Sequence, residues 1–290
     1  MTAHLRCYIF LFLILLSVSS CQKMRVVAEL PMSYPGERME GCDTFLFPVR
    51  IESKEYMFSV DTGATNTILN SSLKPLMGEL VEVRKPDYSF HQTPLEYHKT
   101  KRPLKIGNVS IRGTVALKEI DKQTPGCGID GILGQDVMEQ FIVQIDFRNK
   151  LFKLLKEFSP DVSIRKNWGI QVPLKRDLHG FYCIELKLID GLYENFILDS
   201  GILGHGLLRE EVFDILKNEG QFAEIISNGH RCIALPEACI DECKVSNLGF
   251  IACPDLKLPA GRSMLGTQFL SRFKMITIDL SKGEIYLSPF

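Results

Sequence analysis

The sequence predicts an all-β protein with a few short helices, built as two related β-lobes. Short runs of β-branched and aromatic residues are separated by Gly, Pro, Asn and Asp, and apolar residues rarely recur at the 3.6-residue spacing of a long helix. Two landmarks of the first half also return in the second half in the same order. The 290 residues are enough for one large domain or two smaller ones.

The composition is that of an ordinary globular protein. Hydrophobic residues make up 45% of the chain and charged residues 24%, which excludes disordered, collagen-like and multi-spanning membrane proteins. Lys and Arg number 34 against 35 for Asp and Glu, so the net charge is −1. A chain without an excess of positive charge has no long-range attraction for phosphates, and we expect no nucleic-acid partner.

Residues 1–20 have the features of an export signal. Arg6 precedes an uncharged apolar run that ends at Ser20 and is shorter than the ~20 residues a membrane-spanning helix requires. The run leads into Cys21 through small residues, which resembles a bacterial lipobox, in which the cysteine becomes the acylated N-terminus. We therefore expect an exported lipoprotein of the cell envelope, facing the periplasm or in the outer membrane, with residues 21–41 as a tether. The alternative is a plain secretory signal cleaved near Ser20.

Export would place the remaining cysteines in an oxidising compartment, where some of them are expected to pair. The seven candidates are Cys42, Cys127, Cys183, Cys232, Cys239, Cys243 and Cys253. An odd number leaves at least one thiol free. The last four lie close together beside His230, but their spacing is irregular and lacks the Cys-x₂-Cys pattern of zinc sites. We therefore favour disulfides or buried thiols over a metal, and expect no cofactor.

The first landmark of the repeat is a β-hairpin that ends in an aspartate. In the first copy, a hairpin over residues 45–60 leads into Asp-Thr-Gly at 61–63. In the second copy, a hairpin over residues 182–198 leads into Asp-Ser-Gly at 199–201. Both copies thus join an apolar strand to an aspartate, a small hydroxyl residue and a glycine.

The second landmark is a Leu-Gly pair followed by a short helical stretch and two strands. The first pair is Leu133-Gly134, and the second is Leu265-Gly266. The aspartates are 138 positions apart (199 minus 61) and the Leu-Gly glycines 132 apart (266 minus 134), so the order and spacing of the landmarks are kept. We infer a duplication, with an N-terminal lobe over residues 42–160 and a C-terminal lobe over residues 161–290.

These motifs resemble those of the pepsin and retropepsin-like aspartic peptidases, here as a bacterial exported chain with two duplicated lobes. The resemblance covers residues 42–290. It implies two retropepsin-like β-lobes in the acid-protease fold, with the active site at their interface. It also implies an endopeptidase that acts on a peptide or protein substrate without a cofactor or metal. We expect a monomer, because both halves of the site lie in one chain.

A pair of adjacent carboxyl groups is suited to the hydrolysis of a peptide bond by an activated water. Two carboxyls in contact cannot both ionise easily, so one acts as base while the other acts as acid. The resemblance assigns these roles to Asp61 and Asp199. The loop residues that would hold the two carboxyls in place are Thr62, Gly63, Ser200 and Gly201.

A flap that closes over the substrate is a further implication of the resemblance. The first lobe offers residues 81–100 for this hairpin, with Tyr88 as the candidate for its tip.

The second copy departs from the family pattern directly after its glycine. Ile202 stands where Ser, Thr or Ala is usual, and Ala64 stands at the matching position of the first copy. Neither side chain can donate a hydrogen bond to its aspartate, so we expect higher carboxyl pKa values than in pepsin, and activity at mildly acidic to neutral pH. Two alternatives to an active peptidase stay open. One is an inactive peptide-binding lipoprotein of the cell envelope, and the other is a structural or metal-binding envelope protein built on the cysteine cluster.

Overall fold

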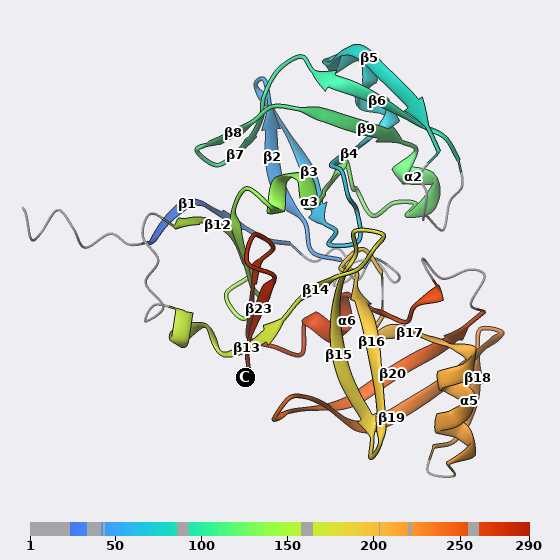
Figure 1. The fold of residues 1–290 in the computed structure, drawn as a ribbon. Helices are drawn as coiled ribbons and strands as arrows, with labels where there is room; N and C mark the ends of the chain where they lie inside the picture. Colours follow the sequence, from blue (N-terminus) through green and yellow to red (C-terminus); the bar gives the residue numbers. More distant parts are fainter. Residues whose placement is uncertain are drawn as a thin grey trace, which may run out of the picture.

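The computed structural model (Figure 1) describes residues 24–33, 42, 44–85, 93–157, 165–202, 204–219, 222–254 and 261–290. These residues form three β-sheets and a few short helices, as the sequence predicts. The longest helix in these ranges is α5 (Glu210–Asn218). None of the helices in the described part of the chain is long and apolar enough to cross a membrane.

A nine-stranded sheet is built from the first half of the chain and lies at the top of Figure 1. Its strand order is β5-β6-β9-β4-β10-β3-β2-β7-β8. The strands are β2 (Phe47–Ile51), β3 (Lys54–Val60), β4 (Ile68–Asn70), β5 (Met77–Arg84), β6 (Leu95–Thr100), β7 (Leu104–Ile106), β8 (Val109–Ile111), β9 (Thr114–Lys118) and β10 (Gly131–Leu133). Alternating residues such as Phe47 and Val49 are fully buried, because successive side chains of a strand point to opposite faces.

An eight-stranded sheet is built from the second half in the order β14-β15-β16-β21-β17-β20-β19-β18. The strands are β14 (Lys175–Arg176), β15 (Tyr182–Ile189), β16 (Leu192–Leu198), β17 (Gly206–Arg209), β18 (Glu224–Ser227), β19 (His230–Ile240), β20 (Cys243–Cys253) and β21 (Met264–Leu265). Phe196 and Phe250 stack in its core with ring centroids 5.6 Å apart. Helix α5 contacts β17 and β20 and buries Val212, Phe213 and Leu216.

A six-stranded sheet combines both halves and lies between the other two in Figure 1. In sheet order its strands are β1 (Met24–Pro31), β12 (Leu151–Glu157), β11 (Ile142–Asp146), β22 (Met275–Asp279), β23 (Glu284–Ser288) and β13 (Ile170–Pro173). The central pair, β11 and β22, places Gln144 opposite Thr277, and the amide of Gln144 donates to the Thr277 hydroxyl at 3.0 Å. These residues are 133 positions apart, which is close to the 132 positions between the two Leu-Gly pairs.

The strand β1 corrects the prediction of a tether over 21–41 for residues 24–31, whereas residues 34–41 lie outside the described residues. Residues 24–31 pair with β12 instead, and Val27, Ala28 and Leu30 pack on the main core. The tether prediction rested on Pro31 and mixed charges, but a proline at the end of an edge strand costs no hydrogen bond inside the sheet. The export signal at 1–20, Cys21 and the lobe boundary at 160/161 lie outside the described residues.

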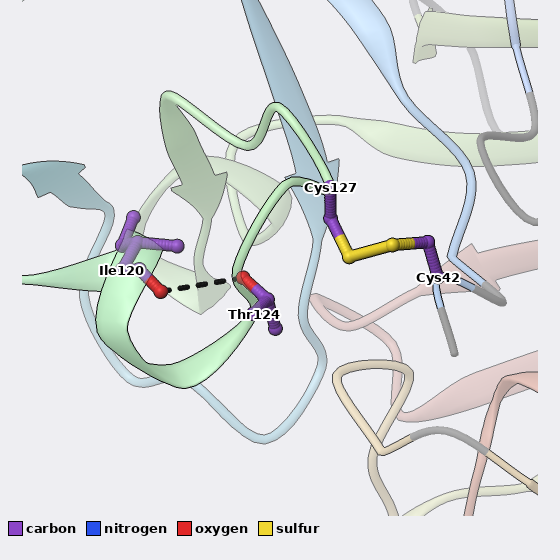
Figure 2. Close-up of a disulfide and its surroundings, with 4 residues drawn as sticks. All are labelled: Cys42, Ile120, Thr124 and Cys127. Carbon is purple, nitrogen blue, oxygen red and sulfur yellow. Dashed lines mark hydrogen bonds between the residues drawn. A yellow bond between two sulfur atoms is a disulfide. The ribbon is translucent and has the colours of Figure 1, made fainter. Parts of the chain in front are cut away.

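One disulfide joins Cys42 to Cys127 (Figure 2), with Cα atoms 5.5 Å apart and 85 positions between them in sequence. It ties the segment before β2 to the loop after α2 (Ile120–Gln123), where the Thr124 hydroxyl donates to the Ile120 carbonyl at 3.3 Å. Closing a loop of this length lowers the conformational entropy of the unfolded chain, which stabilises the folded state by about 4 kcal/mol. Disulfides persist in oxidising compartments, which agrees with the predicted export.

Cys239 and Cys243 of the β19–β20 hairpin do not face one another. Cys239 lies opposite Lys244, and Cys243 lies opposite Ile240, so the two side chains emerge on different faces of the sheet. Cys183, Cys232, Cys239 and Cys243 carry free thiols.

Candidate functional site

Each aspartate of the repeat follows a strand that is held by a Leu-Gly segment. Asp61 comes directly after β3, and its N–H donates to the Leu133 carbonyl at 3.0 Å. Asp199 comes directly after β16, and its N–H donates to the Leu265 carbonyl at 2.9 Å. β10 runs parallel to β3, and β21 runs parallel to β16. The same local arrangement therefore occurs twice, once in each of the two larger sheets.

The two aspartate loops are cross-linked by reciprocal hydrogen bonds through Thr62 and Ser200. The Thr62 hydroxyl donates to the Leu198 carbonyl at 2.6 Å and accepts the Ser200 N–H at 3.0 Å. The Ser200 hydroxyl donates to the Val60 carbonyl at 2.8 Å and accepts the Thr62 N–H at 3.1 Å. Both side chains are fully buried. Four buried hydrogen bonds, each contributing about 1 kcal/mol, fix one loop against the other.

Gly63 and Gly201 allow each loop to approach the carboxyl group of the other. A Cβ atom added at Gly63 would lie 2.7 Å from the Cγ of Asp199, and one added at Gly201 would lie 2.5 Å from Oδ2 of Asp61. No side chain fits in that space unless a carboxyl group moves. The close approach of the loops, rather than an unusual backbone angle, therefore requires glycine at both positions.

The carboxyl groups of Asp61 and Asp199 hydrogen-bond to each other and to their own loops. Oδ1 of Asp61 accepts the N–H groups of Gly63 at 2.7 Å and Ala64 at 3.2 Å. Oδ1 of Asp199 accepts the N–H of Gly201 at 2.9 Å. The structure thus places the two predicted catalytic residues in contact, together with all four predicted supporting residues.

Burial is the largest cause that raises the pKa of both carboxyl groups. For Asp199 the negative charge of Asp61 adds to it, so its pKa lies well above the ordinary value of an aspartate. For Asp61 the hydrogen bond from Asp199 opposes the effect of burial. The prediction from Ala64 and Ile202 of pKa values higher than those in pepsin stays a prediction.

Ile202 has a packing role beside the second aspartate. Its side chain packs against the apolar cluster of Phe181, Cys183, Ile197 and Met264. Its carbonyl accepts the Thr267 N–H at 2.9 Å, which ties the loop to helix α6 (Thr267–Leu270). An apolar residue at this position therefore anchors the Asp199 loop.

Two supporting residues follow the Leu-Gly pairs and were not predicted. The amide of Gln135, at the start of α3 (Gln135–Met138), donates to the Thr62 carbonyl at 2.8 Å. The hydroxyl of Thr267, at the start of α6, donates to the Ser200 carbonyl at 2.5 Å. Both side chains are buried. The sequence did contain a signal for both residues, since each is the polar residue that comes directly after the repeated glycine.

The predicted flap corresponds to the antiparallel pair β5–β6, which forms one end of the nine-stranded sheet. Tyr88, the candidate for its tip, lies outside the described residues. Of the aromatic residues in that segment, Tyr97 is buried against Leu95, Ala116 and Ile68.

Comparison with solved structures shows a fold shared with plant seed globulins. Basic 7S globulin from soybean aligns over 91% of this chain and 95% of its own, with a TM-score of 0.57 and 12% identity. Conglutin gamma, a basic 7S globulin from lupine seeds, aligns over 89% of this chain and 93% of its own, with a TM-score of 0.54 and 9% identity. No protein-family model and no curated protein matches the sequence.

The predicted membership of the pepsin and retropepsin-like peptidase family is therefore wrong. The reported structural relatives are seed globulins, and no sequence comparison supports a peptidase family. Short motifs such as Asp-Thr-Gly describe a local loop, and the same loop can be kept in proteins of different function. Any activity of this chain depends on its own residues.

Proposed function

We propose that this chain is an exported endopeptidase in which Asp61 and Asp199 activate a water molecule against a peptide bond. The supporting observation is the contact between their two carboxyl groups, which hydrogen-bond to each other and sit in loops cross-linked by Thr62 and Ser200. Cross-linking of this kind holds reacting groups in a fixed geometry, which is a main source of rate enhancement.

In the proposed mechanism Asp61 is the base and Asp199 is the acid. Both carboxyls accept backbone N–H groups, and Asp61 is the better anion because it also accepts the hydrogen bond from Asp199 and lies in the field of Lys118. Asp199 keeps the shared proton, because burial and the charge of Asp61 both raise its pKa. Asp61 takes a proton from water while the oxygen attacks the carbonyl carbon, and Asp199 donates its proton to the carbonyl oxygen.

The tetrahedral intermediate then carries two hydroxyl groups on the former carbonyl carbon. Asp61 returns its proton to the amide nitrogen as the C–N bond breaks, and Asp199 takes a proton back from a hydroxyl group. A carboxylic acid and an amine leave, and the pair regains its starting protonation. All protons are therefore balanced within the two aspartates, the water and the peptide.

The nine-stranded and eight-stranded sheets act as two lobes of an acid-protease arrangement, each supplying one aspartate to a site at their interface. A single chain then suffices, and the protein works as a monomer. The Cys42–Cys127 disulfide supports export. Acylation of Cys21 would anchor the protein in the cell envelope.

The test is cleavage of a peptide library by the full chain, produced through an oxidising secretory pathway. We expect Asp61→Asn and Asp199→Asn each to lower kcat/KM by about 10²–10⁴-fold, since each removes one proton-transfer group. The matched control is Asp241→Asn, at an exposed turn between β19 and β20, which should leave cleavage unchanged. Cleavage that survives both substitutions would refute the proposal. Peptide binding without cleavage by the unaltered protein would refute it in favour of an inactive peptide-binding protein.

A further inference from the structure

A hydrogen bond between Tyr182 and Glu139 joins the second half of the chain to the first. The Tyr182 hydroxyl donates to Oε1 of Glu139 at 3.1 Å and lies 3.4 Å from the Leu280 carbonyl. Arg176 contacts both partners, with Nη1 3.4 Å from Oε1 of Glu139 and its guanidinium carbon 5.4 Å from the centre of the Tyr182 ring. Burial and the negative charge of Glu139 raise the pKa of Tyr182, so its hydroxyl keeps the proton that it donates.

Each partner of this contact is connected to one of the two aspartate loops. Glu139 ends helix α3, which begins with Gln135, and the amide of Gln135 donates to the Thr62 carbonyl in the first aspartate loop at 2.8 Å. Tyr182 begins β15, which pairs along its length with β16, and Asp199 comes directly after β16. The contact therefore links the support of one aspartate to the support of the other.

The repeat does not provide a matching contact on the other side of the site. Glu139 corresponds to Ser271, since each lies five positions after its repeated glycine (139 minus 134 and 271 minus 266). Tyr182 corresponds to Thr44, since each lies 17 positions before its aspartate (199 minus 182 and 61 minus 44). The Ser271 hydroxyl donates to the Gln268 carbonyl of its own helix at 3.0 Å, and no hydrogen bond joins it to Thr44 in the part of the chain that the structure describes.

The position of the contact gives it a different mechanical effect from the Thr62–Ser200 cross-link. Thr62 and Ser200 are equivalent residues of the two copies and bond to each other, so their cross-link lies on the axis that relates the copies. Tyr182 and Glu139 are not equivalent, so their contact lies away from that axis. A tie on the axis has a short lever arm against rotation of one half relative to the other, whereas a tie away from the axis has a longer one. Rotation changes the distance and angle between the carboxyl groups, which a reacting pair tolerates only within narrow limits.

We propose that Tyr182 and Glu139 are positioning residues, whose hydrogen bond sets the distance and angle between the carboxyl groups of Asp61 and Asp199. The inference rests on the proposed function, because it concerns the alignment of the same pair. Two carboxyls in close contact share one proton and ionise in two well-separated steps. A wider or tilted pair shares the proton less, so that the two steps move closer together and the pair attacks a bound peptide more slowly.

The experiment removes the Tyr182 hydroxyl with Tyr182→Phe, which keeps the buried ring. The full chain is labelled with ¹³C at the aspartate carboxyl carbons, and NMR follows their ionisation with pH. The signals that disappear in Asp61→Asn and Asp199→Asn identify the pair. We expect the two ionisation steps of the pair to lie about one pH unit closer together in Tyr182→Phe than in the unaltered protein. In peptide cleavage kcat should fall about tenfold, with KM unchanged within about threefold.

Two variants of Glu139 and a matched tyrosine control complete the experiment. Glu139→Ala should reproduce both effects of Tyr182→Phe. Glu139→Gln keeps an oxygen that accepts the hydrogen bond, so it should retain the spacing of the two ionisation steps and most of kcat. The control Tyr193→Phe removes an exposed hydroxyl from β16 and should change neither measurement.

Two results would overturn the inference. One is a Tyr182→Phe protein whose ionisation steps and kcat equal those of the unaltered protein. The other is a Tyr182→Phe protein that unfolds at a lower temperature and cleaves more slowly but keeps the original spacing of the steps, because the hydroxyl would then support the fold alone.

The ionisation measurement also separates this inference from the proposed function, since it requires no cleavage. Ionisation steps that depend on Tyr182, without hydrolysis by the unaltered protein, would remove the proposed function and keep the inference. Hydrolysis by the unaltered protein, with ionisation steps that do not depend on Tyr182, would do the reverse.

Discussion

The Asp61 loop and the Asp199 loop share one backbone design but give their carboxyl groups different surroundings. Asp61 is partly exposed, accepts two backbone N–H groups at Oδ1 and lies in the field of Lys118. Asp199 is only 9% exposed and has no cation among the causes that shift its pKa. The duplicated hydrogen bonds fix where the carboxyls are, and the unmatched residues give the two groups different electrostatic surroundings.

The features that the two loops share and the features in which they differ have separate effects on the site. The elements shared by both loops hold their geometry, namely the hydroxyl cross-link, the glycine contact and the Leu-Gly support. The elements found in one loop alone are electrostatic or apolar, such as Lys118 beside Asp61 and Ile202 beside Asp199. A base and an acid can therefore arise from two copies of the same motif.

The largest expected effect comes from filling the glycine contact. Gly63→Ala places a methyl group against the carboxyl of Asp199, and Gly201→Ala places one against Asp61. The carboxyl can turn away, so the fold should survive. The reacting groups then lose their alignment, and we expect kcat/KM for peptide cleavage to fall by 10²-fold or more.

The matched control is Gly113→Ala, an exposed position with no atom within 4 Å of the added Cβ, which should retain full activity. Because the two loops are related by the repeat, the two glycine variants should lose activity to a similar degree. A Gly63→Ala protein that is folded and fully active would show that the contact between the loops does not align the carboxyl pair.

The cross-link should show a smaller effect, measured as stability. Thr62→Val leaves the Leu198 carbonyl and the Ser200 N–H buried without a partner, and Ser200→Ala does the same to the Val60 carbonyl and the Thr62 N–H. Unpaired buried groups cost about 1–3 kcal/mol, so each variant should lower the free energy of unfolding by this amount. Denaturant titration measures it. Unequal losses from the two variants would indicate that one loop depends on the cross-link more than the other.

The sequence allowed the repeated local features to be predicted. The hairpins over 45–60 and 182–198 correspond to β2–β3 and β15–β16, since alternating apolar residues and a short turn are local signals. The structure also brings Asp61 and Asp199 together, although their catalytic roles stay a prediction. This juxtaposition was implied by the resemblance of both copies to the peptidase motifs.

The features that the sequence did not reveal depend on pairing across the chain. Strand β9 runs parallel to β4, so that Lys118 lies beside Asn70, and nothing near Lys118 in sequence marks that pairing. The strand β1 forms because β12 offers an unpaired edge, whereas its own proline and charges favoured a tether. The disulfide likewise joins cysteines 85 positions apart, among several candidates that spacing alone could not separate.

The pH dependence of stability tests the electrostatic difference between the two loops. The pKa of Asp199 is raised in the folded protein, so above pH ~4 the folded state binds more protons than the unfolded state. The free energy of unfolding then falls as pH rises towards the folded pKa, by at most about 1.4 kcal/mol per pH unit for one proton.

Asp199→Asn cannot ionise and should lose this decline, so its stability relative to the unaltered protein should increase from pH 4 to pH 8. Asp61→Asn should reduce the decline only partly, because burial of Asp199 remains when the charge of Asp61 is removed. Thermal unfolding across this pH range measures both differences, and parallel curves for all three proteins would contradict a shared proton on the pair.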